Sequence, residues 1–400
     1  MTRLAIDIPY LTRVLKELLA VPSPTGYTDE IVRCVSQELE ALGVFYEITR
    51  RGAVRARLDG RKSKPARAFV SHLDTLGAQV KALKDNGRLE LVPIGHWSAR
   101  FAEGARTTIY SDSGAYWGTI LPIKASGHTY NDGIDTLPVG WEYVELRVDA
   151  YSKNSEDLKR LGIDVGDIVS IDPAPEFLEN GFIVSRHLDN KAGVAIMLAA
   201  LKAMIDEGVE PEVDIYWLFT IAEEIGHGAT SVLTPEIASM VAIDNGTSAP
   251  GQNSDEFGVT IGMADQTGPF DFHLTRKMVQ ICRDNDISFQ KDVFRYYRSD
   301  AASAIEAGAD VRTALITFGV DASHGYERIH MHALRSVAEL ATAYAVSPVE
   351  IKRDAREYSS LKGFTVQPTE DADQALHPET DEPAAEPVHE PLDHDATGNT

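Results

Sequence analysis

The sequence predicts an α/β protein in which a mixed, largely parallel sheet is flanked by helices and a small β-rich domain is inserted. The first observation is a set of short apolar runs, such as residues 213–219, that are typical of strands buried on both faces of a parallel sheet. The second is amphipathic periodicity, which predicts a helix over residues 10–19. The third is residues 77–181, where short candidate strands alternate with turn signals.

These three sequence patterns divide the chain into parts. A length of 400 residues is typical of two domains with an appendage. We expect residues 1–76 and 182–350 to form one α/β domain, interrupted by the inserted β-rich domain at residues 77–181. Residues 364–400 form a separate part of different composition.

Breaking and capping residues mark the limits of the elements in the first part. The helix over residues 10–19 is expected to end before Pro22. Thr28 is the expected N-cap of a second helix, which ends near Leu42. Two strands, residues 45–49 and 53–58, are expected to pair.

The elements after the inserted domain follow in the same way. Apolar runs predict a long helix over residues 194–204 and buried strands over residues 240–243 and 313–318. Residues 271–274 suggest a further strand, and residues 334–345 a helix.

Charge and composition exclude several classes of partner. The formal charge of −23 argues against binding to nucleic acid or to anionic membranes. Residues 366–400 hold ten acidic residues and no Lys or Arg, so the rest of the chain carries −13. Because residues 364–400 are rich in Pro, Glu, Asp, Ala and Thr, they are expected to form an acidic disordered tail.

The two cysteines, Cys34 and Cys282, exclude a disulfide framework and a thiolate zinc site of the usual kind. Residues 1–21 carry spaced charges in place of the apolar core of a signal peptide, and no stretch reaches the length of a membrane span. The sequence therefore predicts a cytoplasmic protein.

Two adjacent carboxylates, Glu223 and Glu224, appear where the apolar strand 213–219 ends. Ligands of open α/β sheets collect at the carboxyl ends of strands. Since adjacent residues in extended chain point to opposite sides, the two glutamates cannot share one role. One could bind a metal while the other carries a proton, and the alternative is a solvated helix start.

Another strand ends in Ser71-His72-Leu73-Asp74. His72 and Asp74 project to one face because side chains alternate along a strand. That placement suits a metal-binding imidazole with a carboxylate close behind it, although a lone His-x-Asp is weak evidence.

Three further residues stand at element boundaries. Asp189 precedes a helix, where it could cap the helix or bridge two metal ions. Asp244 follows a predicted strand, where it could be a ligand or a turn residue before Gly246. His324 falls just after the strand over residues 313–318.

Together these residues indicate a metal centre. Two imidazoles and three carboxylates without a thiolate suit zinc, cobalt or manganese. Five ligands would suffice for two ions if one carboxylate bridges them, and a nearby unligated carboxylate could take a proton from bound water. The expected ligands are His72, Asp189, Glu224, Asp244 and His324.

The ordered set of motifs resembles the M42 family of dinuclear metallo-aminopeptidases, which includes glutamyl aminopeptidase and the tetrahedral (TET) peptidases. The motifs are His-x-Asp, Asp-x-Lys-Ala-Gly, Glu-Glu, Asp, Ser-Asp-Ala and His, and the resemblance runs from about Tyr10 to Ser347 with the β-rich insert in its place. It implies a zinc-peptidase-like fold, a catalytic domain at residues 1–76 and 182–350, and two divalent ions.

The resemblance also implies roles for single residues. Asp189 would bridge the two ions, His72 and Asp244 would complete one site, and Glu224 and His324 the other. Glu223 would be the general base, and Asp74 would orient His72. Homo-oligomers, often dodecamers, are implied as well.

The chain departs from the family pattern around the substrate. Thr75 follows Asp74 where the family often has Glu, Asn190-Lys191 replaces Asp-Arg, and Gly325-Tyr326 replaces Ser-Pro. The His-Gly-Tyr-Glu-Arg sequence resembles a bacterial subgroup associated with synthesis of the osmoprotectant N-acetylglutaminylglutamine amide.

Three functions therefore stay open at the level of sequence. The leading hypothesis is an aminopeptidase that removes N-terminal residues from peptides. The second keeps the metals but acts as an amidase or deacylase on a small acylated dipeptide. The third is a non-catalytic scaffold.

Overall fold

The computed structural model describes residues 4–368, and residues up to Gly363 belong to one compact unit. Its α/β part is built on a twelve-stranded mixed sheet. The strands along the sheet are, in spatial order, β1 (Phe45–Ile48), β2 (Val54–Leu58), β12 (Ile215–Thr220), β3 (Ala66–His72), β13 (Ile237–Ser248), β17 (Arg312–Asp321), β18 (Glu327–His330), β11 (Phe182–Ser185) and β10 (Glu176–Phe177).

The centre of this sheet is parallel and its margins are antiparallel. β12, β3, β13 and β17 pair in parallel, whereas β1 with β2, β2 with β12, and the strands beyond β17 pair antiparallel. Three strands branch from the main path beside β17, namely β14 (Val259–Asp265), β15 (Gly268–Pro269) and β16 (Phe289–Val293). The predicted sheet is confirmed, with its parallel order limited mainly to the core strands.

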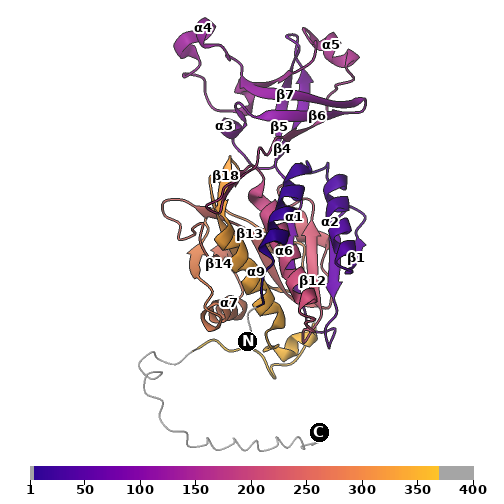
Figure 1. Cartoon of the computed structure of the whole chain (residues 1–400), viewed down its shortest axis with the longest axis vertical. Helices are drawn as coiled ribbons and strands as arrows, with labels where there is room; N and C mark the ends of the chain where they lie inside the picture. The colour runs from indigo at the N-terminus through magenta and orange to yellow at the C-terminus, as the bar shows by residue number, and fades with distance from the viewer. Residues whose placement is uncertain (1–3, 369–400) are drawn as a thin grey trace, which may run out of the picture. The chain divides into compact units, whose positions relative to one another are not determined.

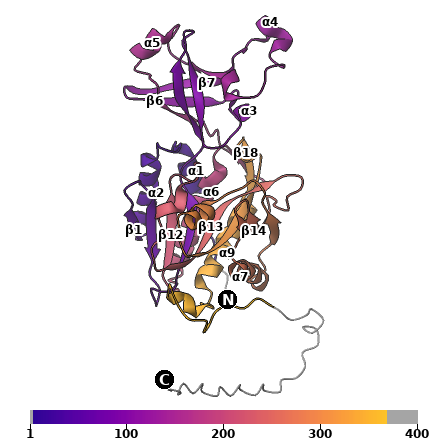
Figure 2. The ribbon, with the colours of Figure 1, turned by 180° about the vertical axis from the view of Figure 1, so that it is seen from behind.

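Helices cover one face of the sheet because their apolar stripes meet its apolar side chains. Helix α6 (Leu188–Asp206) contacts both α1 (Ile8–Ala20) and α9 (Met331–Val346), as Figure 1 shows. α2 (Asp29–Ala41) lies along β1 at the sheet edge (Figure 2).

Both faces of the sheet are packed. The core on the helical face includes Phe69 of β3 and Trp217 of β12, whose rings stack. The opposite face packs Val70 and Leu218 against α8 (Asp300–Glu306). Burial on both faces is the reason why these strands appear in the sequence as continuous apolar runs.

The inserted segment folds as a small closed barrel with its own apolar core, which confirms the predicted small β-rich insert. Its strands are, in order around the barrel, β4 (Gly77–Leu83), β5 (Arg88–Ile94), β8 (Val144–Val148), β7 (Gly114–Pro122), β6 (Arg106–Ser111) and β9 (Ile168–Ile171). Short helices lie in its loops, namely α3 (Ala99–Ala102), α4 (Gly127–Tyr130) and α5 (Ser155–Arg160).

Two local expectations are wrong. Residues 271–274 do not form a strand, because the Asp271 side chain accepts a hydrogen bond from the Leu274 N–H and caps α7 (Phe272–Asp284). Asp244 does not end its strand, because β13 continues to Ser248 in register with β17.

Most of the predicted acidic tail, residues 369–400, lies outside the described residues. Residues 364–368 form neither helix nor strand. Among residues 4–368, no helix combines the length and apolar character needed to cross a bilayer.

Candidate active site

The register of the parallel strands brings the first candidate residues to one level. His72, the last residue of β3, pairs with Thr220 at the end of β12. On the other side of β3, Val70 pairs with Ala242 of β13. His72 and Asp244 therefore both lie two residues beyond a matched pair and project from the same face.

Asp189 lies between the two candidate imidazoles. Its Oδ1 is 3.1 Å from Nε2 of His72, and its Oδ2 is 3.2 Å from Nε2 of His324. Asn245 Nδ2 also donates to Oδ2 at 2.5 Å. No backbone N–H among residues 4–368 donates to the Asp189 carboxylate, whose partners are side chains, so this carboxylate does not cap α6.

The adjacent glutamates contact different imidazoles. An oxygen of Glu223 is 3.7 Å from Nε2 of His72, and an oxygen of Glu224 is 3.8 Å from Nε2 of His324. Their backbone N–H groups donate to the two carboxylate oxygens of Asp74, at 3.1 and 3.3 Å. Asp74 thus fixes the turn that separates the two glutamate side chains.

The contact between Asp74 and His72 is made mainly by the backbone. Nδ1 of His72 lies 2.9 Å from the backbone oxygen of Asp74 and 3.6 Å from its Oδ1. The carboxylate instead accepts a hydrogen bond from Thr25 Oγ1 at 2.6 Å.

Both imidazoles have the same arrangement of partners. Nδ1 of His324 lies 2.8 Å from the backbone oxygen of His96. Because a carbonyl can only accept, Nδ1 carries a proton in both His72 and His324, and Nε2 faces Asp189. Nε2 donates to that carboxylate in the protonated imidazole, and after loss of this proton it can offer its lone pair to a metal. This is the tautomer that a metal-ligating histidine needs.

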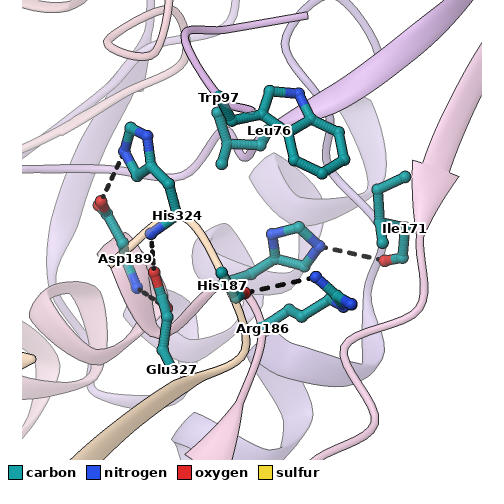
Figure 3. A pocket seen from close by; sticks show the side chains of 9 residues that line it. Leu76, Trp97, Ile171, Arg186, His187, Asp189, His324 and Glu327 are labelled. Atoms are coloured by element: carbon teal, nitrogen blue, oxygen red, sulfur yellow. Dashed lines mark hydrogen bonds and ion pairs between the residues drawn. The ribbon is translucent and has the colours of Figure 1, made fainter. Parts of the chain in front are cut away.

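The site opens onto a cleft of about 920 Å³. Asp189, Glu223, Glu224, Asp244 and His324 lie on its wall. A smaller adjoining pocket shares Asp189 and His324, and Figure 3 shows these two side chains meeting at its edge. All five residues are therefore accessible to a molecule that enters the cleft.

Burial is the largest influence on the pKa values of the acids. It raises the pKa of Glu224 and that of Asp244 to about 8 each, and the Asp189 carboxylate adds repulsion. At Asp189 burial acts in the same direction, but hydrogen bonds from His324 and His72 outweigh it and lower the pKa. Burial lowers the pKa of His324, whereas Glu224 and Asp189 raise it, to about 11 in total.

The site fits a divalent metal. His72, Asp189 and Glu224 each offer a ligand atom, and these atoms lie within 4.8 Å of one another. Oε1 of Glu224 is buried without a hydrogen-bond partner in the described part of the chain. Several buried carboxylates that are offset mainly by imidazoles form a donor set that a cation would complete.

One residue of the site is not predicted by the sequence. Glu327 is 1% exposed, and its two oxygens accept the backbone N–H groups of Asp189 at 3.1 Å and His324 at 2.9 Å (Figure 3). The available signal was an acid three residues after His324, at the start of a strand. Glu327 therefore links Asp189 and His324, two candidate ligands from distant parts of the chain.

The chain is similar to known peptidases over most of its length. Residues 52–340 match the family model described as M42 glutamyl aminopeptidase. "Putative aminopeptidase YhfE" of Bacillus subtilis is 38% identical over 337 residues, which cover 84% of this chain and 97% of the relative.

Two solved structures share the fold. A TET aminopeptidase of a Thaumarchaeota archaeon from marine sediment matches with a TM-score of 0.77 and 17% identity, over 84% of this chain and 96% of that one. The TET1 peptidase of Pyrococcus horikoshii matches with a TM-score of 0.74 and 20% identity, over 84% and 100%. The family match and the Bacillus relative both span most of the chain, so this protein belongs to the M42 peptidase family and is a peptide hydrolase.

Proposed function

We propose that this chain is an aminopeptidase that works with two divalent ions and with Glu223 as general base. The observation that carries the proposal is the placement of Asp189, whose two oxygens lie 3.1 and 3.2 Å from the Nε2 atoms of two separate imidazoles. A carboxylate placed in this way suits a bridge between two ions.

Distances between the proposed ligands suggest how they would be shared between the two ions. His72 would hold one ion with Asp244, whose Oδ1 is 3.9 Å from its Nε2. His324 would hold the other with Glu224, and Asp189 would serve both. Nitrogen and oxygen donors without sulfur suit zinc, cobalt or manganese. When bound, the ions would lower the pKa of water and polarise the scissile carbonyl.

Glu223 suits the role of the base. It lines the cleft, it follows a strand end, and its oxygen is 3.7 Å from His72. Burial raises its pKa well above the usual value, although His72 opposes this effect. Glu223 would take a proton from the attacking water and pass it to the nitrogen of the departing amine.

The substrate would be a peptide with a free amino terminus, and the assembly a homo-oligomer. The name of the matching family supports a preference for an N-terminal glutamyl residue. The Pyrococcus horikoshii relative assembles into a tetrahedron or a large octahedral shell, which supports an oligomer here.

Mass spectrometry of paired peptides tests the activity. Each pair begins with glutamine or glutamate, and one member has a free amino terminus while the other is N-acetylated. Protein loaded with zinc or cobalt should remove the first residue from the free member only. Cleavage of only the acetylated member would replace the aminopeptidase with the amidase that acts on acylated dipeptides. Metal binding without cleavage of either would favour the scaffold.

Glu223→Gln tests the base. The amide keeps the shape of the side chain but cannot accept the proton, so we expect kcat to fall about 10²–10⁴-fold with metal content unchanged. Metal content by mass spectrometry and kcat on the free peptide are the measurements. Glu156→Gln, an exposed change in the barrel, is the matched control. Full activity of Glu223→Gln would remove Glu223 from the mechanism.

A further inference from the structure

Tyr297 lies in the segment between β16 and α8 that borders the cleft. Backbone hydrogen bonds hold the segment at both ends: Phe294 N donates to Ala264 O, and Gln266 N donates to Tyr297 O, each at 3.0 Å. The Tyr297 ring packs against Phe294, with 5.2 Å between ring centroids. The side chain is therefore fixed in place rather than free in solvent.

Within residues 4–368, the hydroxyl of this fixed ring has no hydrogen-bond partner in good geometry. Among the described residues, Tyr297 Oη is a buried side-chain oxygen for which no donor or acceptor lies in bonding geometry. It faces the carboxylates of Asp244, Asp189 and Glu223, and the Asp244 carboxylate is near enough for a weak hydrogen bond outside good geometry. The same three acids line the cleft beside it.

A purely structural role does not account for the hydroxyl. Packing against Phe294 uses the ring alone, and phenylalanine would fill the same space without burying an unpaired polar atom. A buried polar group without a partner calls for a specific explanation. At the wall of a catalytic cleft, the explanation is a partner that arrives with the substrate.

We propose that Tyr297 is a catalytic residue whose hydroxyl donates a hydrogen bond to the oxygen of the scissile carbonyl as negative charge develops there. The inference rests on the proposed function, because it needs a peptide bond that is hydrolysed beside Glu223. A tyrosine hydroxyl has an ordinary pKa of about 10, so it is a donor at neutral pH. Placed donors at this oxygen stabilise the transition state more than the ground state.

The chemical step balances with Tyr297 as a donor only. The oxygen of water bonds to the carbonyl carbon, the π pair moves onto the carbonyl oxygen, and Glu223 takes the proton of water. The carbonyl then re-forms, the carbon–nitrogen bond breaks, and Glu223 returns the proton to the amine. Tyr297 keeps its own proton throughout, and no oxidant or reductant is needed.

Tyr297→Phe tests this role in the full metal-loaded chain. The variant keeps the ring and its packing on Phe294 and removes only the hydroxyl. We expect kcat on the cleaved peptide to fall about 10²–10³-fold, with KM changed by less than about threefold and metal content unchanged. Tyr358→Phe is the matched control, because its hydroxyl belongs to a side chain that is 83% exposed and does not line the cleft.

Two inhibitors separate a catalytic hydroxyl from a structural one. A phosphinic pseudo-dipeptide carries a tetrahedral oxyanion, and free glutamate does not. Tyr297→Phe should lose affinity for the phosphinic compound by about the factor lost in kcat, while its affinity for glutamate stays the same.

Several results would overturn the inference. Unchanged kcat in Tyr297→Phe would exclude the role. A loss of metal together with weaker binding of both inhibitors would show that Tyr297 positions Asp244 instead. Failure of the proposed function is distinguishable from these results, because then the unmodified chain would not cleave the member of a pair that has a free amino terminus.

Discussion

At the scale of single residues, Glu327 shows how one buried acid can hold two proposed metal ligands in position. Its carboxylate accepts hydrogen bonds from the backbone of Asp189 and of His324, which carry two of the proposed ligands. Burial raises the pKa of Glu327 to about 8, and the nearby Asp189 carboxylate adds to the effect. Hydrogen bonds that hold ligands in position commonly affect metal affinity as much as they affect the fold.

Glu327→Gln should therefore weaken metal binding. Its amide has one acceptor oxygen, so one of the two backbone N–H groups would face an NH₂ group instead of an acceptor. We expect about 10- to 100-fold lower metal affinity, measured by titration of metal into chelator-treated protein. Glu156→Gln, which is exposed, should bind metal as the unmodified chain does. Equal affinity in the two variants would show that Glu327 does not support the ligands.

At the scale of elements, helix α6 and strand β3 are packed too closely for a side chain between them. A Cβ on Gly193 would lie 2.1 Å from Oδ1 of Asn190 and 2.7 Å from Oγ of Ser71. Asn190 and Ser71 both donate to the backbone oxygen of Ile243 in β13. The close approach therefore fixes the start of α6, where Asp189 lies.

Gly193→Ala should disturb both the fold and the site. The added methyl group forces Asn190 away from Ile243, and overpacking of this kind costs about 1–3 kcal/mol of unfolding free energy. Urea denaturation measures this loss, and metal titration shows whether Asp189 has moved. Gly127→Ala is the control, because nothing lies within 4 Å of its Cβ. Equal stability of the two variants would mean that α6 can move without affecting the site.

The elements also show how much the sequence could predict. The apolar runs of the central strands were recognisable because burial on both faces leaves a continuous pattern, and His72, Glu223 and Glu224 therefore stood out at the ends of β3 and β12. Asp244 was placed at a strand end, but β17 continues beside β13 and the strand runs on to Ser248. A pairing with a distant strand leaves no trace in the local sequence.

Long-range contacts account for what was missed at the site. Glu327 accepts a hydrogen bond from the backbone of Asp189, which is 138 residues away along the chain. The unpartnered hydroxyl of Tyr297 likewise becomes visible only when the cleft is formed. Local spacing could suggest candidate ligands, whereas the groups that hold or complement them depend on the folded arrangement.

At the scale of the whole molecule, the chain buries several acidic side chains at one place. Its formal charge is −23, and Glu224, Asp244 and Glu327 each have a pKa of about 8 because burial penalises their charged forms. Bound cations would remove this penalty, and their binding energy would add to the stability of the fold. The metal-free and metal-loaded proteins should therefore respond differently to pH.

We expect the chelator-treated protein to lose stability as the pH rises from 6 to 8. Glu224, Asp244 and Glu327 have folded pKa values above an unfolded value of about 4, so they stabilise the fold at low pH and lose this contribution as the pH rises toward 8. His324, whose pKa is raised to about 11, also lowers the stability as the pH rises above 6.5. Lys191, whose pKa burial lowers to about 7, opposes this loss of stability weakly.

Thermal melting with and without metal measures this effect. The melting temperature of the chelator-treated protein should fall by about 4 °C or more between pH 6 and 8, and the increase caused by zinc should be larger at pH 8. Asp244→Asn removes one of the raised carboxyl groups, so its metal-free form should depend less on pH than the unmodified chain. The prediction is wrong if the metal-free protein melts at the same or a higher temperature at pH 8 than at pH 6. These acids would then not be protonated in the folded state, and water or other groups would stabilise their charges without a cation.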